Sequence, residues 1–165
     1  MERLRPSQWQ RLKEIRLAAL LDSPGAFLAT YEKESEYSEG QWRAEFRRGT
    51  WHVRMHDGRA VGLLGVTGEP GAADDERVLE YIWVSPGTRR SHIAIEMVTA
   101  VLAGLHATGV HTVYLWVLDG NEGAARLYER LGFVTTNIRQ PVEGRPGCFE
   151  ERMVLSLDGR PDGFR

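Results

Sequence analysis

This sequence has one cysteine, no long hydrophobic run and a small net charge. Cys148 is the only cysteine among 165 residues, so no internal disulfide can form and a reducing compartment is expected. No apolar run approaches the roughly 20 residues that a membrane-spanning helix needs, and the N-terminus has no apolar segment typical of a signal peptide. A formal net charge of -2 argues against a surface for nucleic acid. We therefore expect a cytoplasmic protein without a membrane or nucleic-acid partner.

The remaining composition is typical of a globular protein. Hydrophobic residues make up 42% of the chain, which is enough for a sizeable core at this length. No internal repeat or low-complexity tract is present. We expect residues 1–165 to form a single domain.

Hydrophobic periodicity and turn residues predict strands and helices that alternate along the chain. The expected strands lie near residues 2–5, 51–55, 60–66, 77–84, 112–118, 133–138 and 149–157. The expected helices lie near residues 7–21, 31–47 and 91–108, with a further one after Asn121. A hairpin turn is predicted at Asp57-Gly58 and a mobile loop at 68–75. The pattern indicates a mixed α/β protein.

The most specific pattern is NxxAxxLYxxxGF, from Asn121 to Phe133. It follows the apolar run Thr112–Leu118, whose β-branched and aromatic residues suit a strand buried on both faces. Asn121 is expected to cap a helix, and Gly132 suits the left-handed position that ends one. The inner stripe of that helix would comprise Ala124, Leu127, Tyr128 and Leu131. A hairpin turn at Asp119-Gly120 is the alternative to this helix.

A second informative stretch, VSPGTRRSHIA, runs from Val84 to Ala94 and joins an apolar strand to an amphipathic helix. Arg89 and Arg90 precede the helix, and both guanidinium groups and the amides of a helix N-terminus bind phosphate. The buried face of the helix would comprise Ile93, Met97, Val98, Val101, Leu102 and Leu105. A solvated basic loop before an ordinary helix is the alternative.

The two motifs together, in this order and spacing, resemble the GCN5-related N-acetyltransferase (GNAT) family. VxPxxRRxHIA is similar to the family's loop for the coenzyme A pyrophosphate, and NxxAxxLYxxxGF is similar to the helix beside its sulfur. Weaker similarity at Arg16–Phe27, Gly132–Val134 and Met153–Leu155 extends the resemblance to most of the chain. It implies one GNAT-type domain with a central twisted, mostly antiparallel sheet of about seven strands and helices on both faces.

The resemblance also implies that acetyl-CoA binds as a co-substrate. The expected cofactor-binding residues are Ile82, Trp83, Val84, Arg89, Arg90, Ser91, His92, Ile93, Ala94, Asn121, Ala124 and Tyr128. His92 stands where the family usually has glycine, which permits close approach of the backbone and a positive φ. Its imidazole would crowd the diphosphate, swing outward or hydrogen-bond to a phosphate. No metal is expected, because His52 and His56 lack a third ligand.

The implied chemistry is direct transfer of an acetyl group from a thioester to an amine, which must be neutral to attack. Tyr128 is the expected acid, because a phenol with a pKa of about 10 stays protonated at neutral pH and can donate to the departing sulfur. Glu80 is the expected base, acting through water, because a carboxylate in an apolar strand must be solvated or paired. Glu80, Ile82 and Val84 share one strand face if no bulge intervenes. A core Tyr128 and a salt-bridged Glu80 are the alternatives.

The expected function is acetyl-CoA-dependent N-acetylation of a primary amine, most often of a small molecule. The alternatives are a non-catalytic acyl-CoA-binding module, an acetyltransferase of peptide or protein N-termini, and an enzyme for longer acyl-CoA. The family branch for ribosomal N-termini has a glutamate five residues before the motif asparagine, where this chain has Trp116. Glu32, Glu36 and Glu39 follow a helical spacing that would attract a cationic amine or form a solvated face. The resemblance also allows a homodimer.

Overall fold

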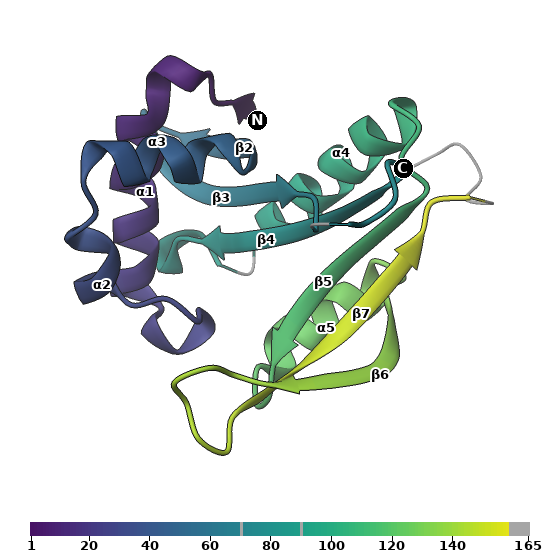
Figure 1. Cartoon of the computed structure of the whole chain (residues 1–165). Coiled ribbons are helices and arrows are strands. Elements are labelled where there is room, and N and C mark those ends of the chain that lie inside the picture. Colours follow the sequence, from purple (N-terminus) through teal and green to yellow (C-terminus); the bar gives the residue numbers. More distant parts are fainter. Residues whose placement is uncertain (70, 90, 159–165) are drawn as a thin grey trace. The chain divides into compact units, whose positions relative to one another are not determined.

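The computed structural model describes residues 1–69, 71–89 and 91–158 (Figure 1). The chain divides into two compact units. The first comprises Met1–Gly68 and Leu79–Met97, and the second comprises Glu69–Val78 and Val98–Arg165. Strand β4 (Glu76–Val84) and helix α4 (Ile93–Ala107) therefore contribute residues to both units.

Seven strands in the described part of the chain form a mixed sheet in the order β1-β2-β3-β4-β5-β7-β6. The other strands are β1 (Glu2–Arg3), β2 (Gly49–His56), β3 (Arg59–Thr67), β5 (Thr112–Leu118), β6 (Val134–Pro141) and β7 (Phe149–Ser156). β4 and β5 pair in parallel, whereas β1–β2, β2–β3, β5–β7 and β6–β7 pair antiparallel. The predicted mixed α/β class and mostly antiparallel sheet are confirmed.

The hairpin between β2 and β3 follows the turn residues in the sequence. Asp57 and Gly58 have φ angles of 47° and 74°, as the two central residues of a type I′ turn require. Only short polar residues and glycine adopt these angles readily, so Asp-Gly is a strong hairpin signal. The predicted hairpin turn is confirmed.

Helix α1 (Trp9–Asp22) supplies much of the core of the first unit. Its buried apolar residues recur mostly every three or four positions, as expected for one face of a helix, and the helix predicted near residues 7–21 is confirmed. They are Trp9, Leu12, Ile15, Ala19 and Leu20. The same hydrophobic cluster includes Trp42 and Phe46 of α3 (Glu39–Arg47), and Val53 and Leu63 of the sheet.

Helices cover both faces of β3 in the first unit, as predicted. Leu63 packs in the cluster formed by α1 and α3, whereas a Cβ at Gly62 would overlap the sulfur of Met97 in α4. Because neighbouring residues of a strand face opposite sides, α1 and α3 lie on one face and the start of α4 lies on the other. The missing side chain at Gly62 is what lets α4 approach this closely.

The helix expected over residues 31–47 is two helices, α2 (Tyr31–Ser35) and α3, which corrects the prediction. A capping box starts α3: the Ser38 hydroxyl accepts from the Gln41 amide at 3.3 Å, and the Ser38 amide donates to Gln41 Oε1 at 2.8 Å. This arrangement satisfies the first amides of a new helix and so favours a break before it. The three glutamates at 32, 36 and 39 therefore do not lie on one continuous helix.

In the second unit, β5 has the predicted bounds but only one fully buried face. Tyr114 and Trp116 are partly buried, so the expectation of a strand buried on both sides is wrong. The Arg152 guanidinium of β7 lies over their rings, with its carbon 4.7 Å and 6.0 Å from the two centroids. The reason is that β5 pairs antiparallel with β7, and antiparallel sheets tolerate one solvated face. The buried side comprises Val113, Leu115 and Val117.

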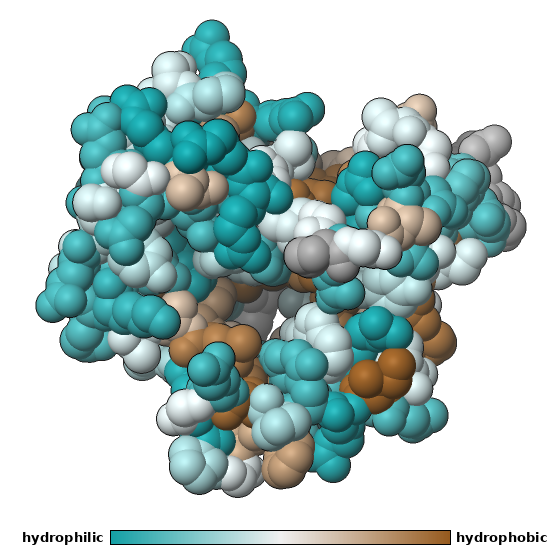
Figure 2. All heavy atoms as spheres, viewed as in Figure 1, coloured by the Kyte–Doolittle hydropathy of each residue, from teal (hydrophilic) through white to brown (hydrophobic). Residues whose placement is uncertain are grey.

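Hydrophobic atoms on the face shown in Figure 2 form small groups among mostly hydrophilic ones. The exposed large hydrophobic residues in the described ranges are Met1, Leu21, Leu28, Val134, Ile138 and Phe149. No helix in the described residues is both long and apolar enough to cross a lipid bilayer.

Candidate active site

The N-terminus of helix α5 (Glu122–Arg130) is fixed by the asparagine of the sequence motif. Asn121 Oδ1 accepts a hydrogen bond from the Ala124 amide at 3.3 Å, which confirms the predicted N-cap. Gly120 adopts a φ of 81°, and the Asn121 amide donates to the Leu118 carbonyl at 3.0 Å. The chain therefore turns from β5 directly into the helix, and the alternative of a hairpin at Asp119-Gly120 is excluded.

The C-terminus of α5 ends in a complete Schellman motif, which also fixes the ring of Tyr128. Gly132 has a φ of 89°, as predicted, and its amide donates to the Glu129 carbonyl at 2.9 Å. The Phe133 amide donates to the Tyr128 carbonyl at 3.0 Å. The aromatic rings of Tyr128 and Phe133 meet edge to face at a centroid distance of 5.9 Å. Gly132 and Phe133 of the motif therefore hold the tyrosine ring in place.

The side chain of Tyr128 is buried. The residue is only 7% exposed, and its hydroxyl forms no hydrogen bond with any other described residue. Burial raises the pKa of Tyr128, because the phenolate would have to form in an apolar environment. The phenol therefore stays protonated at neutral pH and can donate a proton.

Strand β4 is continuous but has an irregular backbone at Tyr81, the residue that follows the expected base. Tyr81 has a φ of 59°, a conformation that costs an aromatic residue about 1–3 kcal/mol. The regular alternation of faces is broken along this strand, and Val78 and Leu79 are both buried. The condition for placing Glu80 and Ile82 on one face, a regular alternation along the strand, is therefore not met.

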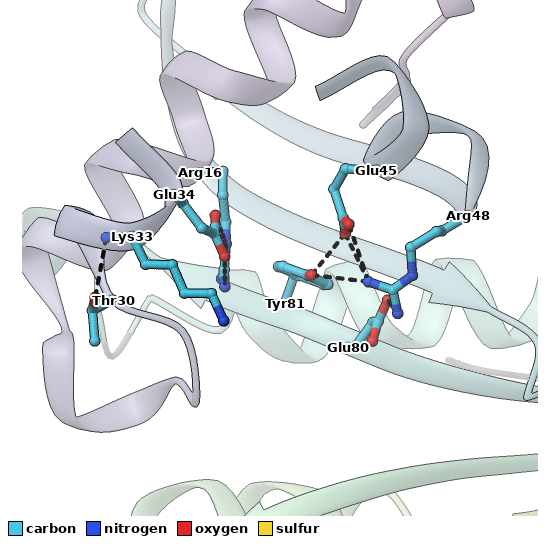
Figure 3. Close-up of polar contacts among 8 residues, drawn as sticks. All are labelled: Arg16, Thr30, Lys33, Glu34, Glu45, Arg48, Glu80 and Tyr81. Atoms are coloured by element: carbon cyan, nitrogen blue, oxygen red, sulfur yellow. Dashed lines mark hydrogen bonds and ion pairs between the residues drawn. The ribbon is translucent and has the colours of Figure 1, made fainter. Parts of the chain in front are cut away.

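Glu80 lies in an ionic network at this irregularity (Figure 3). Its side chain is 26% exposed, and Arg48 Nη2 lies 3.5 Å from Glu80 Oε1. Burial raises the pKa of Glu80, while the Arg48 charge and a hydrogen bond from the Thr67 hydroxyl oppose that rise. The Glu45 carboxylate adds a further upward effect on this pKa. Glu80 is thus both salt-bridged and partly desolvated, which is compatible with a base.

A second ion pair holds the ring of Tyr81 from the other side (Figure 3). Arg16 of α1 and Glu34 of α2 are 3% and 5% exposed, and Arg16 Nη2 lies 2.9 Å from Glu34 Oε1. The Arg16 guanidinium carbon lies 4.0 Å from the Tyr81 ring centroid and 4.6 Å from that of Phe27. The Tyr81 hydroxyl donates to Glu45 Oε1 at 2.7 Å. These contacts stabilise the strained conformation of Tyr81.

His92, just before α4, has a left-handed backbone conformation. His92 adopts a φ of 62° and is exposed, so the histidine occupies the left-handed conformation that favours glycine. Histidine is among the residues enriched in this region. Within the described ranges, the amides of Ser91, His92, Ile93 and Ala94 donate to no protein acceptor. Such amides at a helix start are suited to an anion.

One of the two arginines in this loop is tied to the end of helix α1. Arg89 Nη2 donates to Asp22 Oδ2 and to Ser23 Oγ, each at 2.7 Å, so its guanidinium is tied to the end of α1. Arg90 lies outside the described residues. Trp83 Nε1 donates to the same Asp22 oxygen at 3.0 Å, and the indole is buried in the core. Because the indole is buried, only the backbone of Trp83 is available to a cofactor.

The expected site residues fall into two groups, one in each unit. Residues 80–94 of the expected set belong to the first unit, where Ile82 and Val84 are partly buried in β4. Asn121, Ala124 and Tyr128 belong to the second unit and lie together on α5. Sequence reasoning missed the residues around Glu80 and Tyr81, which are Arg16, Glu34, Glu45, Arg48 and Thr67. The spacing of Glu45 and Arg48 is a helical i, i+3 pair, which is the one local signal among them.

Comparison with solved structures supports the fold. The yncA protein of Salmonella typhimurium, solved with its cofactor acetyl-CoA, superposes with a TM-score of 0.69. The alignment covers 98% of this chain and 95% of that one, at 16% sequence identity. At this identity the similarity shows the fold alone.

Two curated relatives match about half of this chain. The [ribosomal protein bS18]-alanine N-acetyltransferase of Haemophilus ducreyi is 31% identical over 84 residues, which are 50% of this chain and 58% of that protein. The mycothiol acetyltransferase of Brachybacterium faecium is 33% identical over 82 residues, 49% of this chain and 25% of that protein. The matched stretch therefore spans less than two thirds of either relative. A sequence profile of the acetyltransferase (GNAT) family matches residues 9–133, from the start of α1 to the end of the α5 motif. The chain therefore belongs to the acetyltransferase (GNAT) family.

Proposed function

We propose that this protein transfers an acetyl group directly from acetyl-CoA to a primary amine, and that the favoured acceptor is a small molecule. The observation that carries the proposal is the buried, protonated phenol of Tyr128, held by both helix caps within the segment that the family profile matches. Family membership supports acetyl transfer, and the phenol supplies the proton donor that the departing sulfur needs.

The loop before α4 fits the diphosphate of coenzyme A. The amides of residues 91–94 have no acceptor among the described residues, and the positive φ of His92 provides the backbone shape for which the family usually uses glycine. Arg90 would add a charge, whereas Arg89 would have to leave Asp22 to do so. Ile82, Trp83 and Val84 would offer backbone groups to the pantetheine arm. By the family resemblance, Asn121 and Ala124 are further candidates for binding the cofactor. Acetyl-CoA supplies the activated acetyl group as a thioester.

The two titratable residues have separate tasks. Glu80 takes a proton from the protonated amine through water and releases it to solvent, so that the neutral nitrogen can attack the carbonyl carbon. As the new C–N bond forms and the C–S bond breaks, Tyr128 gives its proton to the sulfur. The nitrogen loses its second proton, and a water passes a proton back to the Tyr128 oxygen. Charge and protons then balance: amide and free thiol are formed, and one proton goes to solvent.

The acceptor that we favour is a small amine. One relative is named as an N-acetyltransferase of alanine in ribosomal protein bS18. The family branch that acetylates ribosomal N-termini has a glutamate where this chain has Trp116. Trp116 is partly buried on β5 under the Arg152 guanidinium. A glutamate would provide a negative charge for an incoming α-ammonium group, and an indole does not. A protein N-terminus is therefore the second candidate, supported by the name of that relative.

The test is release of coenzyme A thiol when the full chain and acetyl-CoA are mixed with a panel of small amines and an N-terminal peptide. We expect release with a small amine, together with a rise in melting temperature on addition of acetyl-CoA alone. A thermal shift without release for any acceptor would indicate a non-catalytic acyl-CoA-binding module. If acetyl-CoA fails to raise the melting temperature at all, the cofactor site is wrong.

A further inference from the structure

The guanidinium of Arg48 bridges two carboxylates and a phenol at the end of α3 (Figure 3). Arg48 Nη1 lies 2.9 Å from Glu45 Oε1 and 3.3 Å from the Tyr81 hydroxyl, and Nη2 lies 3.5 Å from Glu80 Oε1. The contact with Glu80 is the longest of the three. Arg48 is therefore anchored to Glu45 and only loosely paired with Glu80.

The exposure of these side chains shows which of them can move. The Arg48 side chain is 51% exposed, whereas those of Glu45 and Glu80 are 17% and 26% exposed. A half-exposed guanidinium can rotate into water at little cost, because surface ion pairs contribute little net stability. A partly buried carboxylate keeps its position and needs another partner when the guanidinium leaves.

Arg16, the other cation near Glu80, is not free to move away from it. Arg16 also influences the carboxylate, but it is almost fully buried, paired with Glu34 through two of its nitrogens and stacked between two aromatic rings. Glu45, Glu80 and Arg48 together carry one net negative charge, from two carboxylates and one guanidinium. An added monocation would neutralise this set.

We propose that the Arg48 guanidinium is a displaceable counter-ion for Glu80, and that the ammonium group of a cationic alkyl amine takes its place when the acceptor binds. This inference rests on the proposed function and narrows its substrate class to amines that are protonated in solution. The Glu80 carboxylate holds the ammonium, while Arg48 swings to Glu45 and solvent. Glu80 then lies beside the ammonium group whose proton it removes through water.

The groups that face Glu80 define what else affects it. They are Arg48 and Glu45 from α3, the Thr67 hydroxyl from β3, Arg16 from α1, and the neighbouring Tyr81. Only Arg48 is both cationic and half exposed. In its absence the pKa of Glu80 should rise, because an attractive charge has been removed from the ionised form.

The test compares Arg48→Met with Arg47→Met, which removes the same charge from an exposed neighbour in the same helix. In Arg48→Met we expect the KM for an alkyl amine at pH 8 to fall roughly two- to fivefold, because no internal cation competes for Glu80. The pKa of Glu80, read by ¹³C NMR of its carboxyl carbon, should rise by roughly half a unit. Arg48→Lys keeps the positive charge but loses the planar guanidinium with its paired N–H donors, and it should give an intermediate KM.

A readout without turnover separates this inference from the proposed function. As butylammonium is added to the wild-type protein, the Nε–H signal of Arg48 and the carboxyl signal of Glu80 should shift together with one affinity. An unchanged or raised KM in Arg48→Met, equal effects in Arg47→Met, or an Arg48 signal that does not respond to butylammonium would overturn the inference. Absence of thiol release with every amine would instead overturn the proposed function, and the NMR titration would still decide whether Arg48 is displaced.

Discussion

Helix α5 in the second unit and the irregular part of β4 in the first hold their titratable residues in opposite ways. Tyr128 is fixed by helix caps and by the edge-to-face contact with Phe133, and its phenol has no polar partner among the described residues. Glu80 is surrounded by charged groups. Burial raises the pKa of the Tyr128 phenol, whereas burial and the Arg48 charge act in opposite directions on the pKa of the Glu80 carboxyl. The comparison shows that burial is sufficient to keep the proposed acid, Tyr128, protonated. The pKa of the proposed base, Glu80, depends in addition on a neighbouring cation.

The largest expected effect is the loss of the base. In Glu80→Gln, kcat should fall by about 10²-fold or more, because a positioned base contributes on the order of 10²–10⁴. The wild-type kcat should fall as the pH drops through the pKa of Glu80, because only the ionised form accepts a proton. Burial raises that pKa, so the fall should begin at a higher pH than for an ordinary glutamate. A full pH–rate profile of both proteins is the measurement, and the variant should lack this acid limb.

The second effect concerns stability and tests the ionic side of the comparison. Arg16→Met should lower the free energy of unfolding by about 3–5 kcal/mol, because it leaves Glu34 as an uncompensated buried charge. The matched control is Arg126→Met on α5, which breaks an exposed pair with Glu122 and should cost about 0.5 kcal/mol or less. Guanidinium chloride unfolding of the two variants gives both values. Equal losses would mean that the buried pair has no special role.

The third effect tests the caps that hold Tyr128. Gly132→Ala should lower the free energy of unfolding by about 1–2 kcal/mol, because alanine is strained at a φ of 89°. Gly123→Ala in the first turn of the same helix has open space around it and should be neutral or stabilising by up to about 1 kcal/mol. Thermal unfolding distinguishes the two. A destabilising Gly123→Ala combined with a neutral Gly132→Ala would contradict the cap assignment.

The smallest effect is expected at His92. Because its backbone already has a φ of 62°, His92→Gly keeps the loop shape and should change stability by about 1 kcal/mol or less. The side chain is exposed, so the affinity for acetyl-CoA, measured by calorimetry, should change by less than about threefold. A tenfold loss of affinity would show instead that the imidazole binds a phosphate.

Local signals in the sequence predicted the elements that depend on a few neighbouring residues. The caps at Asn121 and Gly132 were predicted correctly because each acts within one helical turn. The break at Ser38 was missed, although Ser38 and Gln41 form a capping box, because the apolar and polar pattern continues across it.

The surroundings of the base could not be predicted in the same way. Arg48 and Glu80 are 32 positions apart, and Arg16 and Glu34 are 18 apart, so only packing brings each pair together. The positive φ of Tyr81 could not be predicted locally, because the residue is neither glycine nor asparagine, the residues that usually adopt this conformation. It depends on the long-range contacts of the ring with Arg16 and of the hydroxyl with Glu45. Such features follow from tertiary structure rather than from local propensity.

The most direct test of the account is kcat of Tyr128→Phe, measured at saturating acetyl-CoA and amine, beside the wild-type protein. Because the Tyr128 hydroxyl has no hydrogen bond within the described residues, phenylalanine should leave the melting temperature and the thermal shift by acetyl-CoA unchanged. We predict that kcat falls by about 10²-fold or more. A kcat within about twofold of the wild-type value, with binding retained, would contradict the assignment of Tyr128 as the acid.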